Sequence, residues 1–380
     1  MDCCLFYGRP SFSFATLPSG TYRRPIDSGL RLDRRPLIVL GSASGSSARK
    51  CEFGGLNAPL EPRTPAGRFL SGVLLDDRVS FQFAAREQLE MLAAERDEAD
   101  ARMLLSLGSD EASLHRRIAE LKRDECQAVV EDVMYMLIYH KFSEIGVYLV
   151  PRISQCVYNG RLEIFPSRDW ELESIHSIEA VEMVREHLND VVGWRANSNV
   201  RESWAITEIE RLRLCKLYAA SILYGYFLKS ASLRHGLEWG LYRSNFSIGD
   251  CTHVPLPETF SLESKLVAFS QSSNLRSASV GHVSYGPVNK PKNLKRYVMG
   301  FDKETIQMCA KPKSTEAVNL IERYTLALFG DKNTGLLESD EIISTSFASL
   351  KRFVLEAVAF GSFLLEAENC VNAVYTLEEN

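Results

Sequence analysis

Cysteine pairs with C-x-x-C spacing are missing from this sequence. Its nine cysteines are scattered and none forms a C-x-x-C pair, which argues against a zinc site and against a disulfide framework. A long apolar run is missing as well. The longest one, residues 217–228, lies between two lysines and is shorter than the roughly 20 residues of a membrane-spanning helix. The sequence therefore predicts reduced, mostly buried cysteines and no transmembrane segment.

Familiar catalytic motifs are also absent. The sequence has no G-x-x-x-x-G-K phosphate loop, no G-x-G-x-x-G turn and no H-E-x-x-H zinc helix. The stretch GSASG has Ala43 where a nucleophile elbow needs serine. We therefore assign no catalytic residue, no cofactor and no metal, and a non-catalytic role is favoured while the enzyme question stays open.

The charge is unevenly spread along the 380 residues, although the composition, 45% hydrophobic and 24% charged, is ordinary for a globular protein. The net charge is −5, but residues 1–50 carry +5 and the remainder carries −10. An acidic body lacks the field of cations that nonspecific nucleic-acid binding requires, so no nucleic-acid partner is expected.

The basic first segment, residues 1–55, is typical of an organelle transit peptide because it combines arginine pairs and serines with few acids. The alternative is a disordered tail that targets nothing. If the segment is a transit peptide, we expect cleavage between about Leu40 and Pro59.

Apolar residues at helical spacing dominate the rest of the chain. A helix is predicted from Phe81 to Leu107, stopped by Gly108, and a second one is capped by Ser109 and runs to His140. The two form either a solvent-exposed helical hairpin or plain amphipathic helices. The most apolar helix is predicted over 207–235, and after two shorter helices a last long one covers 346–375. Serines, prolines and glycines over 241–295 indicate a flexible linker.

The least generic stretch is the connector CVYNGRLEIFPSRDWELESIHS, residues 156–177. Asn159-Gly160 fits a two-residue hairpin turn, because both central positions of that turn need positive φ; the competing interpretation is a short helix that ends at Gly160. Ser177 is the expected cap of the next helix.

Glu173 and His176 are the best metal-site candidates, since a carboxylate and an imidazole three apart on a helix can face one metal ion. No second pair of this kind exists, so a solvated face is the simpler interpretation. Asp169, Glu171 and Glu173 alternate and, if extended, would share that face.

Trp170, Trp194 and Trp204 surround the connector and are expected to be buried as anchors, the alternative being an aromatic-lined pocket. On this interpretation the connector is a joint between helices, with a partner surface as its best functional role.

Two parts of the sequence resemble each other. When Gly225 is aligned with Gly361, LCKLYAASILYGYFLKSASLR matches LKRFVLEAVAFGSFLLEAENC, and QAVVEDVMYML upstream matches EAVNLIERYTL. The preserved order indicates a duplication, although buried helices also resemble each other by composition. Each glycine is expected where its helix crosses a neighbour.

The predicted fold is therefore mostly α, a multi-helix bundle built from two related helical units. A small hairpin or turn insertion is expected near 150–166. The predicted organisation is a transit peptide or disordered segment (1–55), a first helical unit (56–240), the linker (241–295) and a second helical unit (296–380).

Several long blocks, from about Ala58 to the C-terminus, resemble the UV-B-induced chloroplast proteins, an uncharacterised domain family of plants and cyanobacteria. These blocks are SDEASLHRRIAELK, ECQAVVEDVMYMLIYHKFSEI, YNGRLEIFPSRDWELESIHS, YAASILYGYFLKSASLRH and LEAVAFGSFLLEAE. The resemblance implies a plastid address and a link to light or ultraviolet stress, and it implies no reaction and no catalytic residue.

Together these observations favour a soluble protein of the chloroplast stroma that acts by binding an unidentified protein partner, in an oligomeric state that the sequence leaves open. One alternative is a metal-binding protein or metalloenzyme that uses Glu173 and His176. Another is peripheral attachment to thylakoids through an exposed apolar helix face.

Overall fold

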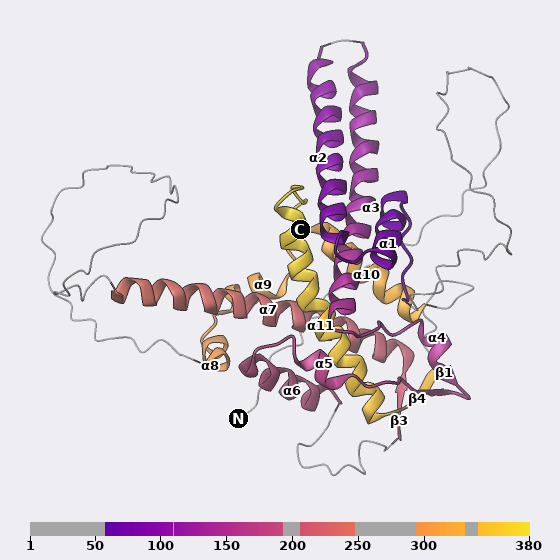
Figure 1. Ribbon diagram of the computed structural model, residues 1–380, viewed down its shortest axis with the longest axis vertical. Coiled ribbons are helices and arrows are strands. Elements are labelled where there is room, and N and C mark those ends of the chain that lie inside the picture. The colour runs from indigo at the N-terminus through magenta and orange to yellow at the C-terminus, as the bar shows by residue number, and fades with distance from the viewer. Residues whose placement is uncertain (1–57, 109, 193–205, 248–292, 331–340) are drawn as a thin grey trace, which may run out of the picture. The chain divides into compact units, whose positions relative to one another are not determined.

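The computed structural model describes residues 58–108, 110–192, 206–247, 293–330 and 341–380 (Figure 1). The predicted transit peptide and most of the predicted linker lie outside these ranges, as do Ser109, Trp194 and Trp204. The described residues form eleven helices and four short strands, so the mostly helical class is confirmed.

The elements follow one another in this order: α1 (Pro65–Asp76), α2 (Phe81–Leu105), α3 (Ala112–Glu144), α4 (Ile153–Cys156), β1 (Val157–Tyr158), β2 (Arg161–Leu162), α5 (Asp169–Glu173), α6 (Ile178–Val192), β3 (Ile206–Glu210), α7 (Arg211–Ser247), α8 (Leu294–Met299), α9 (Lys303–Ala310), α10 (Thr315–Phe329), β4 (Ile342–Ser346) and α11 (Phe347–Asn372).

α2 and α3 lie side by side as an antiparallel pair (Figure 1), and the predicted stop at Gly108 is confirmed by its φ of 94°. Charged side chains join the half of the pair near the turn, where Lys122 Nζ lies 2.6 Å from Glu95. The other half of α3 is buried in the core. α3 begins at Ala112, two residues later than expected, and its cap position is occupied by Glu111 without a side-chain cap bond.

The centre of the fold is the crossing of α7 and α11. A Cβ atom added at Gly225 would lie 2.0 Å from the carbonyl oxygen of Val358, and one added at Gly361 would lie 1.9 Å from that of Ile222. Each helix therefore brings its backbone against the other at a glycine, which confirms the expected close approach. Most of α11 is buried on all sides.

The strands form one sheet in the order β1-β2-β4-β3. β1 and β2 are an antiparallel hairpin, and the Asn159-Gly160 turn has φ values of 52° and 73°, so the predicted hairpin is confirmed. β2 pairs with β4 in parallel, and β3 pairs with β4 antiparallel from Ile206↔Ser346 to Glu210↔Ile342.

The sequence-based expectation for residues 207–210 was wrong, because they form most of β3 and the helix starts only at Arg211. β4 was not anticipated either. Isoleucine and threonine favour strands in both segments, but each segment is too short to show a period of its own. The long-range pairing between them makes both of them strands.

α7 continues to Ser247, seven residues into the segment that was predicted to be a linker. Beyond residue 292 the chain resumes with α8, which starts at Leu294 and packs against α7 and α6. Although α7 and α11 are long, no helix in the described ranges is both long and apolar enough to cross a membrane.

Candidate functional site

The connector is fixed to the C-terminal part of the fold. Thr345 donates a hydrogen bond to the carbonyl oxygen of Leu162 at 3.1 Å, and the backbone N–H of Ile164 donates to Ser349 Oγ at 3.2 Å. The predicted helix cap is present, since the N–H of Ala180 donates to Ser177 Oγ at 3.3 Å. These contacts hold the connector between β4, α11 and α6, as expected of a joint.

The connector residues Asp169, Glu171 and Glu173 do not lie on an extended solvent face. They belong to the short helix α5, and Glu173 is only 8% exposed. Its carboxylate accepts a hydrogen bond from Arg185 at 2.6 Å, while Lys351 Nζ lies 2.9 Å from Asp169 and 3.8 Å from Glu173. Two cations therefore already neutralise the carboxylates that were candidates for a metal.

His176 follows α5 and its imidazole is half-buried. Its pKa is lowered to about 4, mainly by burial and also by the charge of Lys229, while Glu173 opposes the shift, so the ring is neutral at physiological pH. A neutral imidazole beside a carboxylate is suitable for a metal, but the neighbouring cations are not. In the parts of the chain described here, no group of three or more His, Cys, Asp or Glu residues is placed to hold a metal ion.

Trp170 is not the buried anchor that was expected, because 79% of its surface is exposed. In α5 the buried positions are taken by Leu172 and Glu173, so Trp170 in the same turn points to solvent. Two further apolar side chains of the region are exposed, Phe165 at 67% and Ile178 at 91%. Phe165, Trp170 and Ile178 are called the connector surface below.

A buried acidic residue that sequence reasoning missed, Glu356, lies at the centre of the fold on α11. Its carboxylate accepts hydrogen bonds from the N–H of Val150 at 3.0 and 3.1 Å and from the hydroxyl of Tyr218 at 3.1 Å. Arg352 pairs with it at 2.9 Å. Burial raises the pKa of Glu356, and the guanidinium of Arg352 counteracts that shift. The cluster fastens α7, α11 and the segment between α3 and α4 to one another.

Three fully buried tyrosines surround this carboxylate. The ring of Tyr324 lies 6.1 Å from that of Tyr135 and 6.2 Å from that of Tyr218, centre to centre. Burial raises the pKa of all three hydroxyls well above the usual value, so they stay protonated. Hydroxyls in this state do not act as acids or bases near neutral pH.

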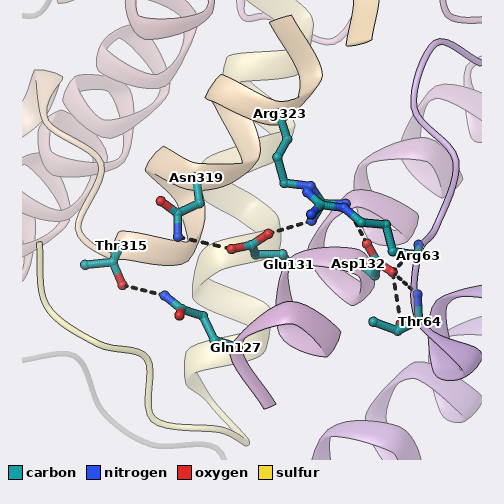
Figure 2. Close-up of polar contacts among 8 residues, drawn as sticks. All are labelled: Arg63, Thr64, Gln127, Glu131, Asp132, Thr315, Asn319 and Arg323. Carbon is teal, nitrogen blue, oxygen red and sulfur yellow. Dashed lines mark hydrogen bonds and ion pairs between the residues drawn. The ribbon is translucent and has the colours of Figure 1, made fainter. Parts of the chain in front are cut away.

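A second buried cluster joins α3 to α10 (Figure 2). Glu131 accepts hydrogen bonds from Asn319 at 3.1 Å and from Arg323 at 2.5 Å, and Arg323 also donates to Asp132 at 2.8 Å. Burial raises the pKa of Glu131, and the bond from Asn319 opposes this. The sequence does contain a signal for this cluster. Two acidic residues lie inside the apolar run AVVEDVMYML, and buried charges need partners.

The three places differ in what they can do chemically. The carboxylates of Glu356 and Glu131 bind other parts of the fold, so their role is to stabilise the packing of the helices. The connector surface instead presents three large apolar side chains to solvent on a segment that is fixed at both ends. It is therefore the candidate functional site, because exposed apolar side chains of this kind suit the recognition of another surface.

Comparison with known proteins relates the chain to a protein family and to a chloroplastic plant protein. A family model described as protein of unknown function, DUF760, matches residues 113–241. A UV-B-induced chloroplastic protein of Arabidopsis thaliana is 36% identical over 352 residues, which cover 90% of this chain and 83% of that protein. No solved structure matches the chain.

Proposed function

The chain belongs to the DUF760 family, together with the UV-B-induced chloroplastic protein of Arabidopsis thaliana, and from this premise we propose that it is a stromal stress protein of the chloroplast that acts by binding another protein. The printed name of the relative supports the compartment and the link to UV-B. The absence of any catalytic motif in the sequence supports binding as the mode of action.

The observation that carries the binding role is the connector surface. Trp170, Phe165 and Ile178 expose most of their area although they lie on a segment that hydrogen bonds fix to β4 and α11. Exposed aromatic side chains on a rigid support are the usual anchors of protein interfaces, because little conformational entropy is lost when they are buried. The surrounding ion pairs, such as Arg168 with Glu171 at 2.8 Å, would form a polar rim.

Photo-crosslinking tests this role. A photoreactive amino acid placed at position 170 should give a discrete crosslinked product in chloroplast extract. The matched control is position 107, where Leu107 is 69% exposed on the α2–α3 turn and lies outside the connector surface. Equal, diffuse labelling at both positions would contradict the proposal.

The plastid address is assigned to the basic segment of residues 1–55. A fluorescent fusion that carries the first 75 residues should enter chloroplasts. A fusion that stays in the cytosol would show that the segment is a plain tail.

A second candidate is peripheral attachment to thylakoids, which one observation favours. Leu104, Leu105 and Leu107 are 61%, 88% and 69% exposed beside the turn between α2 and α3. Asp110 and Glu111 on the same turn oppose insertion into lipid, so we rank this candidate second. Recovery of the protein in washed thylakoid membranes, and its loss on Leu105→Glu, would support it.

We also propose that the two strand–helix units, β3–α7 and β4–α11, come from a duplication. The spacing between Gly225 and Gly361 equals the spacing between the first residues of β3 and β4. It also equals the spacing between the first residues of α7 and α11. The reciprocal contacts at the crossing obey the same spacing, since Ile222 corresponds to Val358.

The helices that precede these units support the same proposal. Tyr135 on α3 and Tyr324 on α10 occupy matching positions of the two sequence copies, and their rings pack on one another. Residues near a twofold axis are expected to meet their own equivalents in this way. The family match over 113–241 covers α3 and most of α7, the two helices that carry the first copy of the matched stretches.

A further inference from the structure

The described chain begins as a fixed segment, residues 58–64, which precedes α1. Pro59 and Pro62 are buried, and the carbonyl oxygen of Pro59 accepts a hydrogen bond from Arg152 at 3.4 Å. Near its end this segment passes the Glu131–Asp132 cluster of α3, where Arg63 and Thr64 point toward Asp132 (Figure 2). Contacts at both ends therefore bind the segment to distant parts of the fold.

Asp132 is the main contact of this segment. One oxygen of its fully buried carboxylate accepts three hydrogen bonds, from the N–H of Arg63 at 2.7 Å, the N–H of Thr64 at 2.8 Å and the hydroxyl of Thr64 at 2.9 Å. The other oxygen accepts from Arg323 at 2.8 Å. A buried carboxylate with four donors is fully satisfied, and loss of the segment would remove three of the four.

Thr64 links this contact to the start of α1. Its hydroxyl oxygen accepts a hydrogen bond from the N–H of Gly67 at 3.1 Å, which caps the helix, and Pro65 follows at the first helical position. Gly67 itself lies so close to Asp132 that an added Cβ would be 2.9 Å from the aspartate side chain. The sequence from Arg63 to Gly67 is therefore shaped to lie against Asp132.

We propose that residues 58–64 are the retained N-terminal end of the mature protein, seated on Asp132, and that the maturation cleavage falls before Ala58. The cleavage part of this proposal rests on the proposed import into plastids. It narrows the cleavage window of about Leu40 to Pro59, because a cut after Pro59 would remove the buried Pro59, and a cut after Arg63 would also remove a donor to the Asp132 carboxylate.

Limited trypsin digestion of the full chain tests whether residues 58–64 are bound to Asp132, and it needs no import step. The Arg63–Thr64 bond is a trypsin site whose two flanking amides both donate to Asp132. In the wild-type chain this bond should stay intact after bonds before residue 58 have been cut. Asp132→Asn should be cut there at least tenfold faster, and Thr64→Val, which keeps both amide bonds, should show a smaller increase.

If Asp132→Asn fails to fold, Thr64→Val alone provides the test. Rapid cleavage of the wild-type chain after Arg63, or an unchanged cleavage rate in both variants, would contradict the binding of residues 58–64 to Asp132.

Import into isolated chloroplasts followed by sequencing of the mature N-terminus tests the cleavage. A mature chain that starts at or before Ala58 supports the proposal, whereas one that starts between Pro59 and Pro65 overturns it. A chain that is not imported at all refutes the plastid address and the maturation cut together, and the trypsin experiment then still decides whether the seat exists.

Discussion

Substitution of the crossing glycines should destabilise the fold even when only one methyl group is added. The Cβ of Gly225→Ala would lie 2.0 Å from the carbonyl oxygen of Val358, and that of Gly361→Ala 1.9 Å from that of Ile222. Both neighbours are backbone atoms, so the helices themselves have to separate by about 1.5 Å to restore ordinary contact. Alanine gains up to about 1 kcal/mol of helix propensity over glycine. Overpacking costs typically about 1–3 kcal/mol, so we expect a net loss.

Thermal and urea melts measure this loss, with Gly236→Ala as the matched control. Gly236 lies on the same helix as Gly225, and an added Cβ there would have no neighbour within 4 Å. The control should therefore be neutral or stabilising. The double variant Gly225→Ala with Gly361→Ala should lose less than the sum of the single losses, because one separation of the helices relieves both clashes. Melting of Gly225→Ala at or above the wild-type temperature would refute the crossing.

Three further expectations concern buried groups. Glu356→Ala leaves Arg352 buried without its partner, so the free energy of unfolding should fall by about 3–5 kcal/mol in urea melts; an unchanged midpoint would contradict the cluster. Burial lowers the pKa of His187 to about 4. As the pH falls, His187 therefore takes up a proton in the unfolded chain before it does so in the folded chain. The free energy of unfolding should be largest above about pH 6.5 and should decline as the pH falls toward 4. His187→Phe should make this decline less steep, and the same slope in both proteins would contradict the role of His187. Protein purified without chelator should contain no stoichiometric metal, whereas iron, zinc or manganese that is lost on His176→Ala would establish the alternative site with Glu173.

Strong local signals made much of the helical fold predictable from the sequence. Three of these signals depend on only a few adjacent residues, and each is present in the structure: the stop at Gly108, the Asn159-Gly160 turn and the Ser177 cap. The crossing glycines were predictable for a similar reason, since a costly residue in an apolar helix indicates a close neighbour.

Features that depend on distant parts of the chain could not be predicted in this way. β3 and β4 are strands because they pair with each other, and Trp170 is exposed because Leu172 and Glu173 occupy the buried side of α5. The partners of the buried acids are similarly remote: Asp132 receives hydrogen bonds from Thr64 and from Arg323, far apart in sequence. An acid in an apolar run indicates that a partner exists but not which one.

Partner binding at the connector surface is tested most directly by the dissociation constant of the partner identified by crosslinking at position 170. Wild-type protein, Trp170→Ala and the control Leu107→Ala should be compared, because both residues are exposed and neither substitution disturbs the core. An anchor tryptophan contributes at least about 2 kcal/mol, so Trp170→Ala should weaken binding about 30-fold or more, while Leu107→Ala should leave it unchanged. Equal affinity of wild type and Trp170→Ala would contradict the proposed function.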